Sequence, residues 1–198
     1  MKKLFASVIV LVLSYTSIQA QGIKLGIKAG TNLTKISGKS FNDGFDLSYH
    51  FGGFMELNFN KKWGIQPEVL WSQSSQKPTS FNAIYGGASV IPTFNGQEPL
   101  KLDYLSFPIL LNYRIGGIFS LLAGPQYSIL INKENNFLQN GQSAFSKGDL
   151  ALVLGGQFNL DFLKIYGRYN IGLTNINDID SKDKWTSQQI QLGLGFRF

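Results

Sequence analysis

The sequence contains no cysteine among its 198 residues. A protein without cysteine can hold neither a disulfide framework nor the lipid-modified cysteine of a lipoprotein. It also has a single histidine, and one imidazole without thiolates supplies too few of the preferred ligands for a zinc site. We therefore predict no metal-binding, cofactor-binding or catalytic residues. One group of acidic residues could bind Ca²⁺ as a loop, but we interpret it as a solvated acidic segment. The group consists of Asp178, Asp180 and Asp183.

Charged residues are scarce as well. They make up 15% of the chain, against roughly 25% in an average soluble domain. After the first twenty positions the basic residues form no run longer than Lys61-Lys62, so the concentrated basic patch of a nucleic-acid binder is missing. No long stretch of helix-forming residues offers an amphipathic helix, whereas 16 Phe, 8 Tyr and 22 Gly favour strands and tight turns.

The first twenty residues have the order of a secretory signal peptide. Lys2 and Lys3 precede an apolar core at residues 4–13, and small and polar residues follow up to Ala20. This core is too short to cross roughly 30 Å of hydrocarbon as a helix. We predict a signal peptide at residues 1–20, cleavage after Ala20, and one mature domain at residues 21–198.

Eight segments of the mature chain alternate strictly between an apolar face and a polar or glycine-rich face. This period of two residues predicts β-strands, and a length of about ten residues suits a tilted strand that spans a bilayer. Phe54 is an exception, because it is an aromatic residue on the polar face of the second segment. The segments are 23–30, 47–59, 63–72, 105–113, 119–129, 149–159, 164–173 and 190–198.

The connections between these segments are alternately long and short. The second, fourth and sixth connections are short, and the glycine pairs at 52, 86, 116 and 155 indicate bends and turns. The remaining connections are long and rich in Gly, Asn, Ser and Lys, at residues 34–44, 74–99, 132–147 and 174–187. This alternation is typical of periplasmic turns and external loops. We therefore predict an all-β, eight-stranded antiparallel up-and-down transmembrane β-barrel with both ends on the periplasmic side.

A soluble barrel with an apolar interior is the competing interpretation. The apolar face carries more aromatic rings than the interior of an eight-stranded barrel has room for, so we place it toward lipid. Aromatic side chains at both ends of the strands would then form two interfacial girdles. The short-turn girdle would contain Phe59, Trp63, Tyr113, Phe119, Phe158 and Phe198, and the outer one Tyr49, Trp71, Tyr127 and Tyr169.

Charged residues of both signs fall on the face assigned to the lumen. Charges in a confined space need partners, so we predict a salt-bridge and hydrogen-bond plug in preference to an ion path. Ser48, His50 and Glu56 share this face and could be drawn as a hydrolase site, although residues on one face need not touch. The charged and histidine residues of the predicted lumen are Lys24, Lys28, His50, Glu56, Glu68, Asp149, Arg168 and Arg197.

The chain contains four short motifs, the longest of which is Asp103-Tyr104-Leu105-Ser106-Phe107-Pro108-Ile109-Leu110-Leu111-Asn112-Tyr113. Together these motifs resemble the PorT-like outer-membrane β-barrel family of Bacteroidota, and the terminal Phe196-Arg197-Phe198 resembles the insertion signal of outer-membrane proteins. The resemblance implies the barrel fold, the cell outer membrane and recognition by the barrel-assembly machinery. Some relatives are linked to gliding or type IX secretion. The other motifs lie at 26–33, 123–127 and 167–173.

These observations favour a small integral outer-membrane protein without enzymatic turnover. We expect it to be a monomer with a plugged lumen and a structural or interaction role through its long external loops, surrounded by outer-membrane lipid and binding an unidentified external ligand or protein. A narrow pore or a transport- or secretion-associated component is the first alternative. An outer-membrane enzyme with a site near His50 is the second.

Overall fold

A computed structural model describes residues 23–37, 44–76, 100–131, 148–175 and 186–198. The predicted signal peptide and its cleavage site lie outside the described residues. The same is true of the proposed acidic segment at Asp178, Asp180 and Asp183, of the glycine pair at residue 86, and of most of each long connection.

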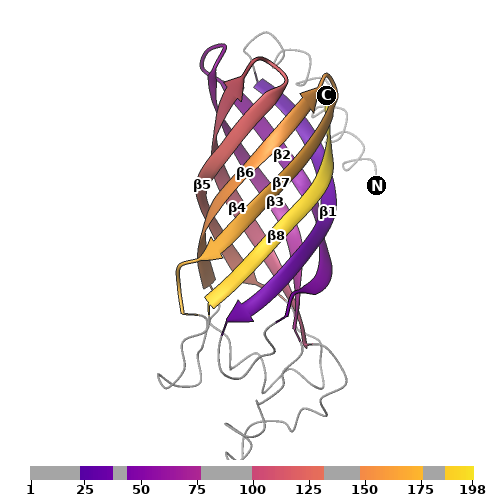
Figure 1. Cartoon of the computed structure of the whole chain (residues 1–198), viewed down its shortest axis with the longest axis vertical. Helices are drawn as coiled ribbons and strands as arrows, with labels where there is room; N and C mark the ends of the chain where they lie inside the picture. Colours follow the sequence, from indigo (N-terminus) through magenta and orange to yellow (C-terminus); the bar gives the residue numbers. More distant parts are fainter. Residues whose placement is uncertain (1–22, 38–43, 77–99, 132–147, 176–185) are drawn as a thin grey trace, which may run out of the picture.

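The described residues form eight antiparallel strands that close into one barrel (Figure 1). Each strand pairs with its neighbours in the sequence, and β8 pairs with β1 over twelve residue pairs, from Gly26 with Arg197 to Ser37 with Thr186. The predicted fold class is confirmed. The strands are β1 Ile23–Ser37, β2 Asp46–Asn58, β3 Trp63–Gln76, β4 Leu100–Ile115, β5 Phe119–Leu130, β6 Gly148–Leu160, β7 Leu163–Gly172 and β8 Thr186–Arg197.

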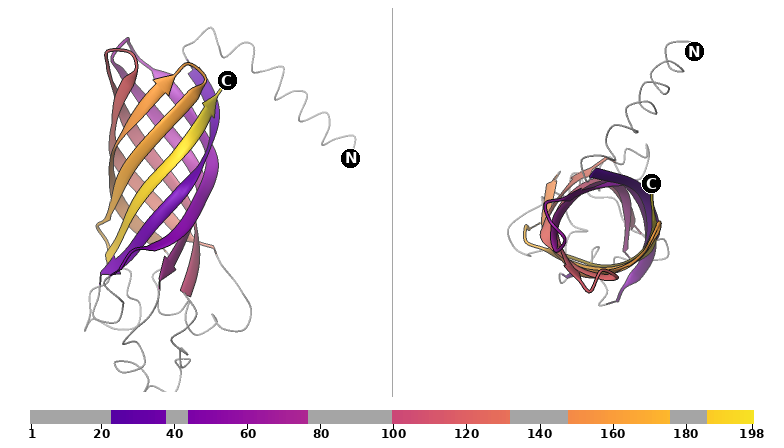
Figure 2. Two further views of the ribbon diagram at one scale, coloured as in Figure 1. Left: turned by 45° about the vertical axis from the view of Figure 1, so that its right-hand side comes forward. Right: turned by 90° about the horizontal axis from the view of Figure 1, so that it is seen from above.

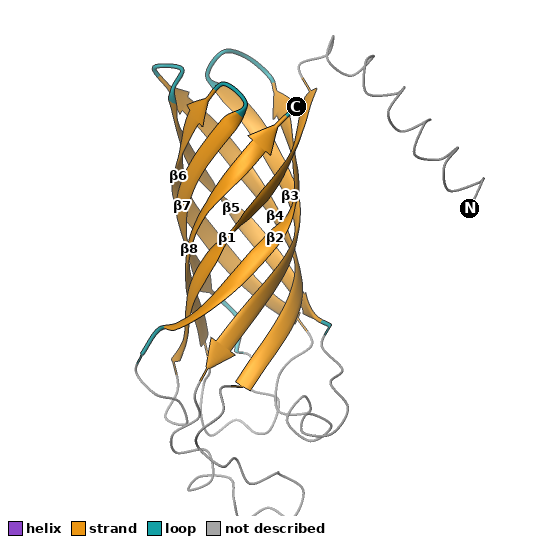
Figure 3. Cartoon of the chain, turned by 90° about the vertical axis from the view of Figure 1, so that its right-hand side faces the viewer, coloured by secondary structure: helices purple, strands orange, loops and turns teal. Residues whose placement is uncertain are grey.

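Three short turns close one end of the barrel, the end at which the chain finishes (Figures 1 and 3). In the β2–β3 turn, Asn60 Oδ1 accepts hydrogen bonds from the backbone N–H groups of Lys62 and Trp63, both at 2.8 Å, as turn asparagines commonly do. In the β4–β5 turn, Gly116 and Gly117 have φ angles of 63° and 83°, which glycine adopts without the clash of a Cβ atom. The interpretation of this glycine pair as a turn is confirmed.

The strands extend further toward the opposite end than the sequence pattern predicts. β1 continues to Ser37 and β3 to Gln76, although the sequence predicts long connections at residues 34–44 and 74–99. β3 and β4 pair up to Gln76 with Leu100, whereas the β4–β5 ladder ends at Tyr104 with Leu130. The end of β3, from Gln73 to Gln76, is polar on both faces, so it carries no hydrophobic alternation to detect. The start of β4 does alternate, with Leu100, Leu102 and Tyr104 against Lys101 and Asp103, and the predicted segment left it out. The β3–β4 ladder consequently projects beyond the rest of the wall (Figure 2).

The outer surface of the wall is apolar and the inside is largely polar. Leu192, Val69 and Ile27 are each more than half exposed, while Gln66, Asn32 and Arg168 are buried. This distribution is the reverse of a soluble barrel and matches a strand that faces lipid on one side and a polar lumen on the other. The structure thus decides against the soluble alternative. Among the described residues no helix is long and apolar enough to cross a membrane.

Aromatic pairs lie near both ends of the wall. At the short-turn end, Trp63 and Tyr113 have ring centroids 4.5 Å apart, and Phe119 and Phe158 lie at 5.1 Å. Toward the loop end, the Trp71 ring lies 5.3 Å from that of Tyr49. The positions of these residues fit the two girdles that the sequence predicted, where amphipathic rings favour the lipid headgroup region.

The barrel lumen and its outer mouth as the candidate functional site

Glu68 is at the centre of a buried charged cluster in the lumen. Its Oε1 lies 2.8 Å from Lys28 Nζ and its Oε2 lies 2.8 Å from Arg168 Nη1. The three side chains come from β3, β1 and β7, so the cluster bridges opposite sides of the barrel. All three are at most 1% exposed. A fourth side chain, Gln66, donates to Glu68 Oε1 at 2.8 Å.

A hydrogen-bonded group next to this cluster surrounds His50. His50 Nε2 lies 2.6 Å from the Tyr166 hydroxyl and Nδ1 lies 2.5 Å from Asn32 Oδ1. Gln191 joins the two groups, because its Nε2 donates to Asn32 Oδ1 at 3.1 Å and its Oε1 accepts from Arg168 Nε at 2.5 Å. Lys28 Nζ lies over the Tyr166 ring, 3.9 Å from the ring centroid. This cation–π contact helps to stabilise the ammonium group.

A second charged group occupies the short-turn end of the lumen. Lys164 Nζ lies 2.5 Å from Glu56 Oε1 and also donates to Asn159 Oδ1 at 2.7 Å. Arg197 Nη1 lies 3.7 Å from the second carboxylate oxygen of Glu56, Oε2. Phe54, the aromatic exception of the second segment, is buried between the two charged groups, with its ring centroid 5.6 Å from Lys28 Nζ and 6.0 Å from Lys164 Nζ.

Part of the lumen is apolar, although the alternation predicts a polar lumen face. Leu110, Leu122 and Val153 form a buried cluster on β4, β5 and β6, and Leu70 and Leu102 are also buried. Leu70, Leu110, Leu122 and Val153 interrupt the alternation, since each is apolar and stands between two apolar residues of the outward face. Leu102 instead stands between Lys101 and Asp103. A strand that is apolar on both faces is buried on both sides, and this signal could have predicted an apolar filling of the lumen next to β3–β6.

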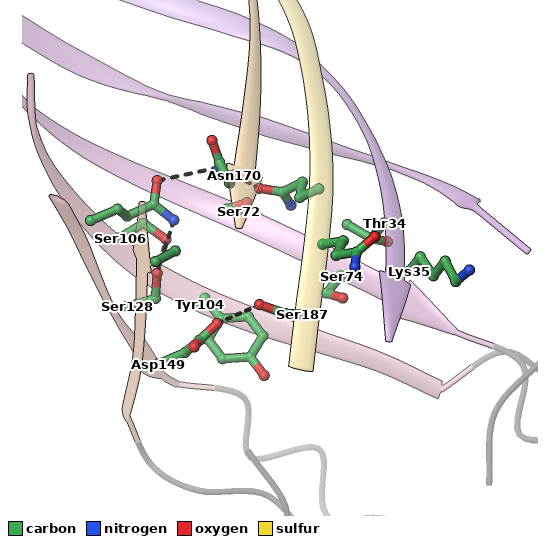
Figure 4. Close-up of a pocket in the computed structure, with 14 residues that line it drawn as sticks. Thr34, Lys35, Ser72, Ser74, Tyr104, Ser106, Ser128, Asp149, Asn170 and Ser187 are labelled. Carbon is green, nitrogen blue, oxygen red and sulfur yellow. Dashed lines mark hydrogen bonds between the residues drawn. The ribbon is translucent and has the colours of Figure 1, made fainter. Parts of the chain in front are cut away.

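The outer mouth of the lumen is lined mainly by hydroxyl and amide groups (Figure 4). It encloses a cavity of about 40 Å³, enough for a few water molecules. Asp149 lies on one side and accepts hydrogen bonds from Thr174 Oγ1 at 2.7 Å and from Ser187 Oγ at 2.6 Å. Ser106 and Ser128 pair at 2.9 Å on the neighbouring strands. The outer mouth is therefore a polar cavity on the loop side of the charged cluster.

The predicted lumen residues fall into two sets. Five of them are buried, namely Lys28, His50, Glu56, Glu68 and Arg168. The other three, Lys24, Asp149 and Arg197, are partly exposed near the ends of the barrel.

Ser48, His50 and Glu56 share the lumen face, but each is engaged elsewhere. Ser48 Oγ donates to the backbone carbonyl of Gln73 at 2.6 Å, and Glu56 pairs with Lys164. Both nitrogens of His50 are taken by Tyr166 and Asn32. None of these contacts links a nucleophile to a base, which a hydrolase site of this kind requires. In the described part of the chain no three His, Cys, Asp or Glu side chains are grouped to hold a metal ion.

A closed eight-stranded barrel that is apolar outside and polar inside is an integral outer-membrane protein. The chain belongs to the outer membrane protein beta-barrel domain family, which it matches over residues 19–178. The match ends before β8, and the structure shows that β8 completes the barrel. No curated protein sequence matches the chain.

Solved structures of small outer-membrane barrels are similar to the chain at low identity. Ail, the attachment invasion locus protein of Yersinia pestis, is 18% identical, with 88% of this chain and 98% of Ail covered and a TM-score of 0.48. Neisserial surface protein A is 14% identical, with 88% and 97% covered and a TM-score of 0.49. OprG from Pseudomonas aeruginosa is 13% identical, with 90% and 97% covered and a TM-score of 0.49.

Proposed function

We propose that the protein is a monomeric, non-catalytic outer-membrane barrel whose lumen is closed by its own side chains. The observation that carries this proposal is the network around Glu68, which joins β1, β3, β7 and β8 across the lumen. The apolar cluster on β4, β5 and β6 accompanies it. In an eight-stranded barrel, side chains are enough to fill the interior.

The energetics of the Glu68 network support a closed lumen. A buried charge is stable only if its partners stay in place, and breaking such a pair by removing one partner costs about 3–5 kcal/mol. An ion that passed this point would have to displace Lys28 or Arg168 from Glu68. The two cations would then be left without their carboxylate partner, so a permanently conducting state is unfavourable.

The role of the protein is then exerted from its outer end. The polar outer mouth around Asp149 and the projecting β3–β4 ladder lie at this end, where the long connecting segments begin and end. Loops on a rigid scaffold are where binding residues are concentrated. We infer that these segments bind an external ligand or protein, with the barrel as the anchor.

We further infer that the chain is a PorT-like member of its family, from a bacterium of the Bacteroidota. The support is the set of four motifs, which lie on β1, β4, β5 and β7, with Leu173 one residue beyond the end of β7. The motifs at 26–33 and 167–173 contain the lumen residues Lys28 and Arg168. The motifs carry no feature specific to secretion or gliding.

Planar-bilayer recording of the purified protein tests the closed lumen. We expect no steady unit conductance from the natural sequence. The double variant E68A/R168A removes the centre of the network and should produce small, irregular currents, whereas the matched pair S106A/S128A at the mouth should stay silent. Large and reproducible unit currents from the natural sequence would show that the protein is a pore.

A further inference from the structure

The ladder between β2 and β3 ends before either strand does. Its last pair toward the loops is His50 with Ser72, although β2 begins at Asp46 and β3 continues to Gln76. The other edge of each strand stays paired over this stretch, since β2 pairs with β1 as far as Asp46 and β3 pairs with β4 as far as Gln76. The seam between β2 and β3 is therefore open at its outer end.

Side chains bind the outer end of β3 where the β2 backbone would otherwise pair with it. The carbonyl of Gln73 accepts hydrogen bonds from Ser48 Oγ at 2.6 Å and from Asn32 Nδ2 at 3.0 Å. At Ser75 the backbone N–H donates to Thr34 Oγ1 at 3.2 Å, and the carbonyl accepts from the same oxygen at 3.1 Å. Asn32 and Thr34 are buried side chains of β1. These contacts hold the end of β3 on the lumen side of β2.

The displacement of β3 leaves part of the β2 edge without a partner. Backbone groups along an antiparallel strand point alternately to its two neighbours. The carbonyl of Leu25 bonds to β8, so the even-numbered residues of β1 point to β2 and their partners Asp46 and Ser48 point back. Leu47 and Tyr49 therefore point to the open seam. Within the described residues no hydrogen bond reaches the N–H or carbonyl of Leu47 or the N–H of Tyr49.

The side chains along this edge are apolar and exposed. Leu47 and Tyr49 are each more than half exposed, and Phe45, just before the strand, is exposed as well. Tyr49 belongs to the outer aromatic pair with Trp71, so Leu47 and Phe45 lie on the loop side of that pair. An exposed strand edge with apolar side chains is a template for pairing with another chain.

The unpaired groups specify the chemistry of the occupant. Two N–H donors and one carbonyl acceptor lie on alternate residues of a strand, and another extended backbone presents the complementary groups at the same spacing. An acyl chain offers neither donors nor acceptors. Strand addition of this kind gains affinity from the backbone hydrogen bonds and specificity from alternate side chains.

We propose that the open edge of β2 at Leu47 and Tyr49 binds an extended segment of an external protein as an added strand. The inference rests on the proposed function in one respect, namely that the partner binds at the outer end of the barrel. A partner that bound only the long connections would satisfy the proposed function and leave this edge unpaired. A conducting lumen would refute the closed barrel and leave the edge unaffected.

Hydrogen exchange of backbone amides, followed by NMR of the full protein in phospholipid nanodiscs, tests the edge. The probe is a synthetic hexapeptide of alternating Thr and Val with blocked ends. In the free protein we expect fast exchange at Leu47 and Tyr49 and slow exchange at Ser48 and His50, which pair with β1. Millimolar peptide should slow exchange at Leu47 and Tyr49 by at least about tenfold.

Two substitutions at Leu47 separate backbone pairing from side-chain contact. Proline has no N–H and is tolerated on strand edges, so L47P should abolish the effect of the peptide at Tyr49. L47A is the matched control, because it keeps the N–H and should weaken binding only about two- to threefold. A hexapeptide with N-methyl groups on alternate residues keeps its side chains and should not bind the natural protein. Heat-modifiable gel mobility selects the folded samples.

Four results would overturn the proposal. Slow exchange at Leu47 and Tyr49 without peptide would show that the chain itself covers the edge. The same protection appearing only at high protein concentration would make a second copy of the chain the occupant. Unchanged exchange in millimolar peptide would show that the edge accepts no strand. Equal binding of the N-methylated peptide would assign the contact to side chains instead of the backbone.

Discussion

Gly52 and Gly53 are neighbours in β2 that face opposite sides of the barrel wall. A Cβ atom at Gly52 would lie 2.0 Å from the backbone carbonyl oxygen of Val69, whereas the nearest atom at Gly53 is 3.6 Å away. We expect G52A to lower the free energy of unfolding by about 1–3 kcal/mol, because the β2–β3 backbones must separate. G53A is the matched control and should change it by less than about 0.5 kcal/mol. Urea titration in phospholipid vesicles measures both, and equal effects would contradict the inward assignment of Gly52.

Charge balance around Glu68 gives a second residue-scale prediction. The cluster contains two cations, Lys28 and Arg168, and one anion. E68Q leaves both cations buried without their counterion and should cost about 3–5 kcal/mol of unfolding free energy. K28M removes the surplus cation and leaves one matched pair, so its effect should be much smaller. The comparison uses the same urea titration, and a K28M variant as unstable as E68Q would disprove this account of the cluster.

The charged cluster also shows where sequence information ends at the residue scale. Period-two alternation placed Lys28, Glu68 and Arg168 on the lumen face, and all three are buried there. It could not identify their partners, because Glu68 and Arg168 are 100 residues apart. Contacts across a lumen depend on strand stagger and barrel diameter. Neither quantity can be derived from the sequence of a single strand. Tyr166 was missed although it alternates in step with Lys164 and Arg168, because an aromatic side chain was expected on the lipid face.

Individual strands were predicted more completely than their ends. All eight segments are strands in the structure, since each has one face toward lipid and one toward the lumen. The ends at Ser37, Gln76 and Leu100 were missed. Near Gln76 both faces of the strand are polar, so the alternation that identifies the strand disappears. The start of β4 keeps the alternation, since Leu102 is buried between Lys101 and Asp103, and this signal could have extended the predicted strand.

β8 supplies a prediction at the scale of one element. Leu194 is 48% exposed on the lipid face, and an arginine there should cost about 2–4 kcal/mol near the midplane and less toward the interface. L194M keeps the position apolar and should be nearly neutral. Heat-modifiable mobility and urea titration of the folded fraction report both variants. A folded L194R protein with unchanged stability would contradict the lipid-facing assignment of β8.

The lumen face of the same strand contains Gln191, which is buried and hydrogen-bonded to Arg168, Asn32 and Gln189. Truncation to alanine would leave the Arg168 Nε–H group without its acceptor in a buried site. Loss of such a buried partner commonly costs about 1–3 kcal/mol, so Gln191→Ala belongs with the sensitive variants.

At the scale of the whole molecule, the barrel is stabilised by closure as well as by local pairing. The β1–β8 ladder extends over twelve pairs, and the backbone N–H of Phe198 donates to the carbonyl of Leu25 at 2.9 Å. An open edge in hydrocarbon would leave a row of unsatisfied backbone groups, each costing several kcal/mol. Folding of the isolated strands in the membrane is therefore unfavourable until the last strand pairs.

The short distance between Phe198 and Leu25 makes the chain suitable for circular permutation. A short linker from Phe198 to Ile23, with new ends between β4 and β5, would keep every ladder bond while removing the free carboxyl-terminal phenylalanine. If closure alone governs assembly, we expect the permuted protein to refold in detergent and in cells alike, as judged by heat-modifiable mobility. If the insertion machinery needs a terminal aromatic residue, refolding in detergent would succeed and assembly in cells would fail. The permutant thus separates the role of the last strand in barrel stability from its role as a recognition signal for the insertion machinery.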